Sequence, residues 1–193
     1  MEKFDLCVIG AGPSGFAAAM RALDFGKRVA LVERNKVGGA GIFDGALSSK
    51  TLWELSESYQ LTHNTNLGYT VYDSEVHFSS VMHQAHRAVA EKHVQLKKQI
   101  SYFEKTGQLT FFNGHAKFAS KNEIGITNAE GQSQTIWADN TVMAVGSRPR
   151  YLPNIPIDEK IILTSDGVSS LPDFPKSIVI LGAGVIGCEF ATI

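Results

Sequence analysis

Two glycine-rich stretches carry the residue spacing that binds the phosphates of a dinucleotide. Residues 10–15 read GAGPSG and residues 182–187 read GAGVIG, and each lies between an apolar run and a helical pattern. In a strand–turn–helix the first glycine permits the tight turn, the second lets a pyrophosphate approach the backbone, and the third lets the helix pack against the strand. Unpaired amides at the helix N-terminus then face the phosphates. The sequence therefore predicts two dinucleotide sites.

The first stretch is surrounded by the elements that such a site needs. Residues 4–9 form an apolar run, residues 13–26 repeat apolar side chains at helical spacing, and residues 28–33 form a second apolar run that ends in Glu33. A carboxylate at this position can accept hydrogen bonds from a ribose diol. The βαβ pattern predicts a parallel sheet. The alternative interpretation is a glycine-rich turn that only packs tightly.

The second stretch has fewer of these elements. Residues 177–181 predict its strand, but the sequence ends at Ile193, six residues after Gly187. The residue that would choose between NAD and NADP is therefore not present, because it follows the next strand. We expect the chain to be a fragment of a longer protein, since a Rossmann half needs several strands and helices to bury its faces.

The rest of the chain contains residue patterns that predict further helices and strands. The patterns predict helices over 51–63 and 78–107, a β-meander over 109–136, a buried strand over 140–146 and a proline-rich link over 151–161. The fold class expected from this map is α/β. It comprises a Rossmann-like domain with a parallel sheet and a β-meander, followed by the start of a second Rossmann-like domain.

Composition argues against several other functions. The 193 residues carry a formal net charge of −1, which gives no electrostatic case for binding nucleic acid or an anionic membrane. No segment approaches the length of apolar sequence that spans a bilayer, and the N-terminus does not resemble a secretion signal. Both cysteines, Cys7 and Cys188, lie in runs that read as buried structure. We expect a cytoplasmic protein without nucleic-acid or membrane partners.

The segment GGAGIFDGALSSK at residues 38–50 resembles a family's redox segment, GG-T-C-x-N-x-G-C-x-P-S-K, but without its cysteines. The positions that match in register are Gly38, Gly39, Gly45, Ser49 and Lys50. Gly41 and Ala46 occupy the two cysteine positions, and Ser48 occupies the proline position. With the two glycine turns, this segment makes the chain similar to the N-terminal part of the pyridine nucleotide–disulfide oxidoreductases.

This resemblance implies cofactors and domain limits. The first site would bind FAD and the second NAD or NADP, with an FAD domain over residues 1–150, a linker over 151–175 and a truncated nicotinamide domain over 176–193. NGHAKF resembles the stretch whose backbone, near Ala116, meets the adenine of FAD, and TVMAVGSRPR resembles the strand that closes the FAD domain. In the family, Lys50 and Glu189 would pair beside the flavin N5 edge, and we assign them the catalytic roles. The expected cofactor-binding residues are Gly10, Gly12, Pro13, Ser14, Gly15, Glu33, Arg34, Gly39, Lys50, Ala116, Gly146, Ser147, Gly182, Gly184 and Gly187.

The missing cysteines limit the chemistry. Electrons cannot cross a disulfide relay without two thiols, so dithiol–disulfide exchange by the family route is excluded unless another chain supplies them. Flavin chemistry does not need these thiols, because reduced flavin can pass electrons to a quinone, oxygen, a dye or another nicotinamide. The first hypothesis is therefore an FAD- and NAD(P)H-dependent oxidoreductase with a small-molecule, non-disulfide acceptor. The second is a degenerate FAD-binding remnant without activity.

The remaining candidates carry weaker signals. His83, His86 and His93 share one side of the long helix, and we interpret them as a solvated face rather than a metal site, because their spacing does not suit one ion. Cys188 is not expected to have a redox role. Family members dimerise through a C-terminal domain that lies outside this sequence, so the sequence predicts no oligomeric state for the chain.

Overall fold

The structure is a computed structural model that describes residues 1–68 and 70–193. It divides into two compact units. The first comprises Met1–Ile42 and Lys92–Arg148, and the second comprises Phe43–Glu91 and Pro149–Ile193. The helix α4 (Phe78–Lys105) contributes its first half to the second unit and its second half to the first.

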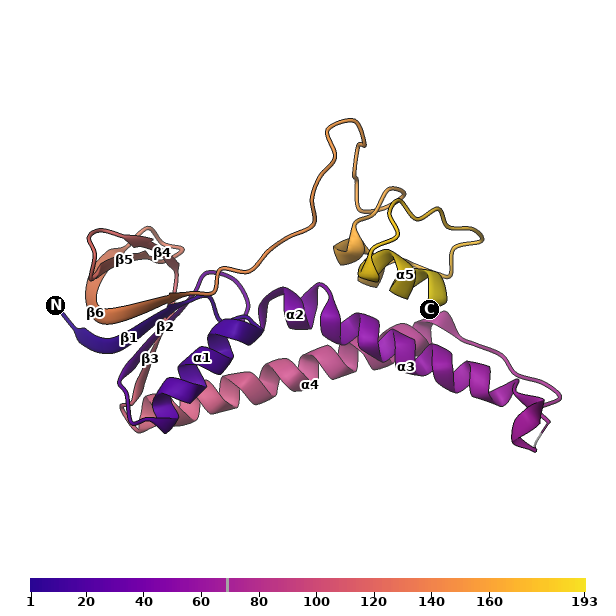
Figure 1. The fold of residues 1–193 in the computed structure, drawn as a ribbon, viewed down its shortest axis with the longest axis horizontal. Helices are drawn as coiled ribbons and strands as arrows, with labels where there is room; N and C mark the ends of the chain where they lie inside the picture. The colour runs from indigo at the N-terminus through magenta and orange to yellow at the C-terminus, as the bar shows by residue number, and fades with distance from the viewer. Residues whose placement is uncertain (69) are drawn as a thin grey trace. The chain divides into compact units, whose positions relative to one another are not determined.

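The first unit is built on a six-stranded sheet with the order β3-β2-β1-β6-β5-β4 (Figure 1). The strands are β1 (Lys3–Ile9), β2 (Val29–Glu33), β3 (Leu109–Asn113), β4 (His115–Phe118), β5 (Glu123–Thr127) and β6 (Ser133–Met143). The four strands β3, β2, β1 and β6 run parallel, whereas β5 and β4 continue the sheet antiparallel. This confirms the expected α/β class with a parallel sheet.

The two central parallel strands are buried on both faces, which explains their unbroken apolar runs. In β2 the side chains of residues 29–32 are at most 1% exposed. The helix α1 (Pro13–Asp24) packs against β1 and β2, and it buries Phe16, Ala19 and Leu23 at helical spacing. The sequence therefore forms the βαβ unit that its periodicity predicts.

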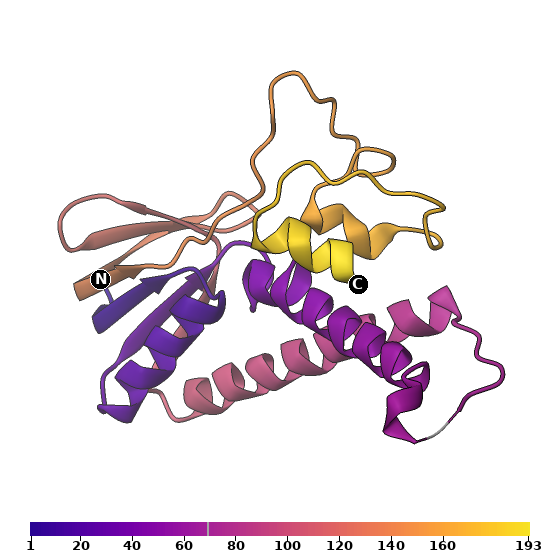
Figure 2. The ribbon, with the colours of Figure 1, turned by 45° about the vertical axis from the view of Figure 1, so that its right-hand side comes forward.

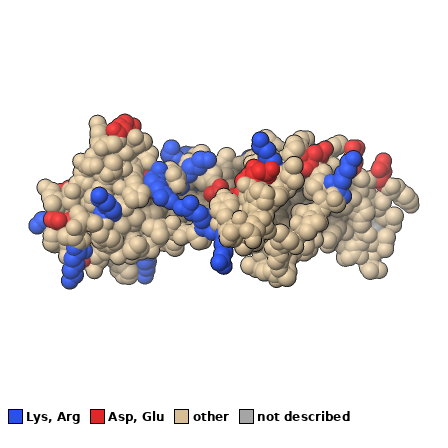
Figure 3. All heavy atoms as spheres, turned by 90° about the horizontal axis from the view of Figure 1, so that it is seen from above, with Lys and Arg blue, Asp and Glu red and all other residues tan. Residues whose placement is uncertain are grey.

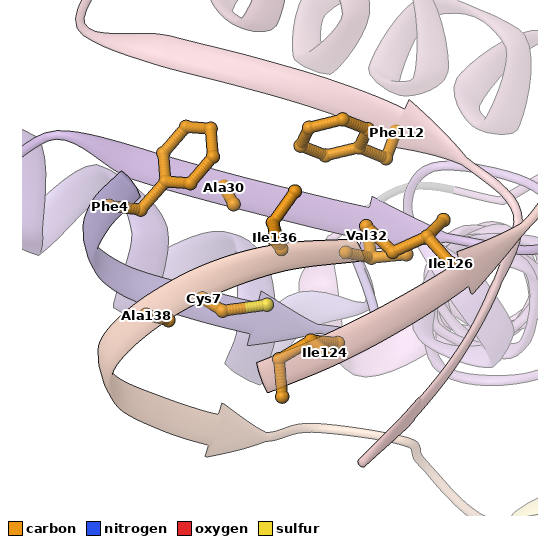
Figure 4. Packing of buried hydrophobic residues seen from close by; sticks show 9 residues of the cluster. All are labelled: Phe4, Cys7, Ala30, Val32, Phe112, Ile124, Ile126, Ile136 and Ala138. Atoms are coloured by element: carbon orange, nitrogen blue, oxygen red, sulfur yellow. The ribbon is translucent and has the colours of Figure 1, made fainter. Parts of the chain in front are cut away.

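The face of the sheet that does not carry α1 is covered by side chains of β5 and β6, which belong to the same sheet. A cluster of buried side chains joins β1, β2 and β3 to β5 and β6 (Figure 4). Its members are Phe4, Cys7, Ala30, Val32, Phe112, Ile124, Ile126, Ile136 and Ala138. The rings of Phe4 and Phe112 meet edge to face, with centroids 6.0 Å apart. Burial raises the pKa of the Cys7 thiol to about 12, so this cysteine is a packed apolar residue, as the sequence predicts.

Two predicted strands are placed differently in the structure. The segment 109–113 is not the first strand of the meander, since β3 pairs in parallel with β2. The meander consists of β4, β5 and β6. The predicted closing strand at 140–146 is the second half of β6, which pairs with β5 through its first residues and with β1 through its last. Both errors arise because alternating apolar residues define a strand but not its partner.

The second unit is mainly helical (Figure 2). Its elements are α3 (Ala46–Thr62), η1 (Thr65–Leu67), η2 (Ser165–Ser170), α5 (Val185–Thr192) and the first half of α4, while the short helix α2 (Gly39–Phe43) crosses the boundary between the units. Leu52, Met82 and Ala85 form its buried cluster. The helix α5 packs against α3, although more than 120 residues separate them in the chain.

The predicted strand at 177–181 is not present. These residues pair with no other segment in the part of the chain that the structure describes. The side chains of Ile178, Val179 and Leu181 are exposed, with Val179 86% accessible, and that of Ile180 is half-buried. An apolar run becomes a strand only where a neighbouring strand satisfies its amides and carbonyls, and none of the described strands lies in this unit.

The surface charge agrees with the small net charge of the sequence. Acidic and basic side chains both occur along the whole face shown in Figure 3. Among the described helices, none combines the length and the apolar character that crossing a membrane requires.

Candidate dinucleotide site and ion pair

The first glycine turn joins β1 to α1 at the carboxyl end of the parallel strands. Gly10 has a φ of +103°, a conformation that L side chains rarely adopt. A Cβ on Gly10 would lie 2.2 Å from the carbonyl oxygen of Ala144, the residue that follows β6. The chain is fixed on both sides, because Gly10 donates to the carbonyl of Val32 at 2.8 Å and Ala144 donates to that of Ile9 at 2.8 Å. The turn therefore needs glycine where the strands converge.

The N-terminus of α1 forms an open cradle beside this turn. Gly12 is its N-cap and Pro13 its first residue, and no side chain among the described residues caps it. The first amides of the helix, including that of Ser14, thus have no intrahelical partner. No described atom lies within 4 Å of a Cβ built on Gly12, whereas one on Gly15 would lie 1.9 Å from the Gly10 carbonyl oxygen. The open space, the free amides and the helix dipole suit a pyrophosphate.

Glu33 lies at the end of β2 and is already held by the backbone. Its Oε2 accepts a hydrogen bond from the Ala11 amide at 2.8 Å, and its Oε1 accepts one from the Asn35 amide at 2.8 Å. Each carboxylate oxygen keeps a second lone pair that can accept from a ribose hydroxyl. These two backbone amides orient the Glu33 carboxylate beside the glycine turn. The neighbouring Arg34 is exposed.

The segment before α2 closes the turn from another side. The Gly38 amide donates to the Ala11 carbonyl at 2.8 Å. A Cβ on Gly39 would lie 3.1 Å from the Cα of Gly12. Backbone therefore meets backbone here, and Ala11 links Glu33 on one side to Gly38 on the other. The structure brings together the glycine turn, Glu33 and Gly39.

His93 contacts the segment that closes this turn, so its predicted place on a solvated helix face is wrong. It is half-buried rather than part of a solvated face, and its Nδ1 bonds the Val37 carbonyl at 2.9 Å. His83 and His86 are exposed as expected. Helical periodicity could not reveal the contact, because the partner of His93 lies 56 residues earlier in the chain. Among the described residues, no group of His, Cys, Asp and Glu is arranged to hold a metal ion.

The other residues predicted for the first site, Ala116, Gly146 and Ser147, lie on β4 and in the segment after β6. Gly114 donates to the backbone carbonyl of Glu33 at 2.9 Å, which sets the start of β4 beside the acid. Ala116 lies two residues further on β4 and is half-buried. Gly146 and Ser147 follow β6 and are exposed.

Lys50 and Glu189 meet in the second unit. The Lys50 Nζ lies 2.6 Å from the Glu189 Oε1, and this pair joins α3 to α5 across 139 residues of sequence. The Glu189 side chain is only 12% exposed, whereas that of Lys50 is 62% exposed. The hydrogen bond from Lys50 holds the pKa of Glu189 below its usual range, against an opposing effect of desolvation and with a further contribution from the Ser49 hydroxyl. Glu189 is thus an ionised carboxylate with an exposed ammonium beside it.

Helix α5 follows the second glycine turn. Gly182 has a φ of +115°, and a Cβ on Gly187 would lie 2.3 Å from the Gly182 carbonyl oxygen. Around Gly184, the N-cap of α5, no described atom lies within 4 Å of a built Cβ. The turn has the local geometry of a phosphate cradle. The predicted residues thus fall into two groups, one in each unit.

The two cysteine positions of the family have different surroundings. Gly41 lies in α2 and is half-buried against the first turn of α1. Ala46 begins α3 and is exposed. Ser48, at the proline position, donates from its hydroxyl to the Gly45 carbonyl at 3.0 Å. The chain's own cysteines are elsewhere, with Cys7 buried in the sheet and Cys188 exposed on α5.

Comparison with known proteins agrees with this geometry. A family profile described as pyridine nucleotide-disulphide oxidoreductase matches residues 4–193. Curated relatives include dihydrolipoyl dehydrogenase of Trypanosoma brucei brucei, 33% identical over all of this chain and 40% of the relative. A second is the mitochondrial dihydrolipoyl dehydrogenase of Bos taurus, 34% identical over 98% of this chain and 37% of the relative. The chain therefore spans about two fifths of the length of these relatives.

Solved structures give the same fold. LpdA from Mycobacterium tuberculosis superposes with a TM-score of 0.82 at 22% identity, covering 98% of this chain and 41% of LpdA. The flavoprotein disulfide reductase RclA from Escherichia coli, described as a Cu(II) complex, superposes with a TM-score of 0.75 at 24% identity, covering 99% of this chain and 40% of RclA.

Proposed function

Because this chain belongs to the pyridine nucleotide-disulphide oxidoreductase family, we propose that it is the FAD-binding part of an oxidoreductase that uses NADH or NADPH and a non-disulfide acceptor. The observation that carries the proposal is the Lys50–Glu189 ion pair at 2.6 Å in a chain whose two cysteine positions hold Gly41 and Ala46. The charged pair is present and the sulfur is absent. This combination suits a flavin that gives its electrons to something other than a thiol.

The residues of the first unit fit FAD. Gly12 and the first amides of α1 would receive the pyrophosphate, and Glu33 would accept from the ribose. The backbone near Ala116 would lie along the adenine. FAD supplies the transfer of a hydride from nicotinamide and the onward release of electrons. The protein residues would bind and orient FAD. The groups around the bound cofactor would then determine which electron acceptor reacts with it.

Lys50 and Glu189 would act as charges of fixed position. Glu189 is largely shielded from water, and it holds the Lys50 ammonium by a short, charge-assisted hydrogen bond. An ammonium in this position favours the gain of negative charge on a neighbouring group. We assign Lys50 this electrostatic role and Glu189 the role of orienting it. The acceptor we propose is a quinone, oxygen or a second nicotinamide.

The experiment is a spectrum of the purified chain under anaerobic conditions. Bound FAD gives visible absorbance, and bleaching on addition of NADH or NADPH supports the whole proposal. Bleached protein that reoxidises with a quinone or oxygen, but not with lipoamide disulfide, supports the acceptor. Protein that takes up no added FAD would overturn the proposal.

A second candidate is FAD binding without activity. The exposed, unpaired run at residues 177–181 favours it, because the glycine turn after this run stands without a sheet among the described residues. Yellow protein that neither nicotinamide bleaches would support this candidate over the enzyme.

A further inference from the structure

The strands β3 and β4 form the two edges of the sheet, and they differ in how their sequences oppose further pairing (Figure 1). The strand β4 has four residues and carries the exposed Lys117, and both short length and a lysine protect an edge. The strand β3 has the sequence LTFFN, which is uncharged and rich in residues that favour strands. An edge of this composition offers its unpaired backbone groups to another chain.

The central outward amide of β3 is occupied by a side chain. The Phe111 amide donates to Oε1 of Glu104 at 3.2 Å instead of to β2. Glu104 lies seven residues earlier, in the last turn of α4. A strand that paired with this edge would need the same amide as a donor. The carboxylate therefore takes the place that the carbonyl of an added strand would occupy.

The end of α4 holds Glu104 in this position. Gly107 has a φ of +74°, and its amide donates to the Glu104 carbonyl at 3.0 Å. The Gln108 amide donates to the Phe103 carbonyl at 3.2 Å, which completes the Schellman arrangement of a helix end. The Gln108 carbonyl then accepts from the Val29 amide at 2.9 Å, so the chain joins β2 directly after the helix. The helix end and β3 are thus fixed relative to one another.

Glu104 is in an unfavourable place for the helix itself. The dipole of a helix favours basic side chains in the last turn, as Lys105 is, and disfavours acidic ones. Among the described residues, Glu104 forms no ion pair that would offset this cost. Its side chain bonds the edge of the sheet. The contact with β3, rather than helix stability, is what the carboxylate supplies.

We propose that Glu104 protects the edge of the sheet, by occupying the Phe111 amide and so preventing β3 of a second copy of the chain from pairing there. The second copy is the expected partner because two uncharged LTFFN strands can pair without burying a charge. With Glu104 in place, pairing would have to break its hydrogen bond and cover a carboxylate, which is costly. The inference concerns assembly and does not depend on the proposed function.

Sedimentation equilibrium and hydrogen exchange of the full chain test this role. Glu104→Ala should raise the association constant by about tenfold, and in dilute solution its Phe111 amide should exchange about tenfold faster, which is the effect of one hydrogen bond. Glu104→Gln keeps an acceptor oxygen and should retain the slow exchange of this amide. Glu91→Ala is the matched control, since it removes the same charge from the same helix, where Glu91 pairs with Arg87 at 3.6 Å.

A second variant locates the new contact. Adding Asn113→Lys to Glu104→Ala places a charge at the exposed end of β3 and should return association to the wild-type level. Association that persists in this double variant would place the contact elsewhere and overturn the inference.

Three further outcomes would contradict it. The first is equal association of Glu104→Ala and Glu91→Ala, which would indicate a general effect of charge. The second is an unchanged exchange rate of the Phe111 amide in Glu104→Ala. The third is unfolding of that variant, because alanine suits a helix at least as well as glutamate, so that lost folding would mean a structural role for Glu104.

Discussion

The molecule contains two glycine turns of nearly the same shape in very different surroundings. The first glycine has a φ of 103° in one turn and 115° in the other, and the N-cap glycines have φ of −70° and −76°. In both, a Cβ on the third glycine would strike the carbonyl of the first. In both, the helix opens with the same backbone bond from the residue after the third glycine to the N-cap carbonyl, at 2.8 and 3.0 Å. The shape of the turn is therefore local.

The two turns differ in what holds them. The first lies between parallel strands, with Gly10 against Ala144 and Glu33 bonded to Ala11. The second follows a largely exposed run that pairs with none of the described strands, and the helix after it is joined to α3 through the Lys50–Glu189 pair. Six residues are therefore enough to form the local turn that suits a phosphate. A dinucleotide site also needs a sheet around the turn and an acidic residue from elsewhere in the chain. Four predictions test this difference.

The largest effect is expected from the third glycines. Gly15→Ala should lower the free energy of unfolding of the sheet unit by about 3 kcal/mol, because its Cβ would press on both Gly10 and Ala144. Gly187→Ala should cost no more than about 1 kcal/mol, since an exposed turn can relax. Urea unfolding followed by Trp137 fluorescence in a Trp53→Phe background reports the first unit, and the reverse background reports the second. Equal losses would mean that the sheet does not distinguish the turns.

The second prediction concerns the open cradles. Gly12→Asp fills free space, and as an N-cap residue it should keep or slightly raise thermal stability. The added charge opposes a phosphate, so FAD affinity should fall by about a hundredfold, or about 2.7 kcal/mol. Gly184→Asp is the matched control and should leave FAD affinity unchanged. Flavin fluorescence titration measures both; an unaffected Gly12→Asp variant would remove the first cradle from the proposed site.

A third, smaller effect is expected at His93. His93→Leu should cost about 1 kcal/mol and weaken FAD binding, because the Val37 carbonyl beside the first turn loses its partner. His93→Gln, which keeps a donor, should recover part of both. If His93→Gln and His93→Leu behaved alike in the FAD titration, the hydrogen bond to the carbonyl of the buried Val37 would not matter for FAD binding.

The smallest effect on stability is expected at the ion pair. The pKa of Glu189 is lower in the folded chain, so the pair stabilises above the unfolded pKa, and this stabilisation is lost as pH falls through the folded pKa. With Lys50 largely exposed, we expect less than about 1 kcal/mol. Lys50→Gln should raise the pKa of Glu189, measured by carboxyl NMR titration. It should also speed amide exchange in α5 but not in α1; equal change in both helices would contradict the assignment.

The sequence predicts best where neighbours in the chain are neighbours in space. The unit of β1, α1 and β2 was predicted from periodicity and glycines alone, since each part contacts the next. The parallel pairing of β3 and the continuity of β6 were not predicted, because the residue pattern of a strand does not specify which strand it pairs with. Residues 177–181 have the composition of a strand, but none of the strands that the structure describes pairs with them.

The same rule holds for the two groups of site residues. The meeting of Lys50 with Glu189 was expected from a family resemblance, not from any spacing in the chain. The hydrogen bond of His93 to Val37 could not be predicted, because it depends on the exact approach of two segments that are distant in sequence. Packing, rather than composition, decides such contacts.

The pairing of β1 with β6 has a consequence for synthesis. Cys7 pairs with Thr141, so β1, once it has left the ribosome, cannot complete its place in the sheet until more than 130 further residues have emerged. Contacts of such sequence separation form slowly, and an uncovered strand edge invites association with other chains. We expect nascent β1 to depend on chaperones until β6 has emerged, and ribosome-bound chains that end before residue 133 to be captured more readily than longer ones.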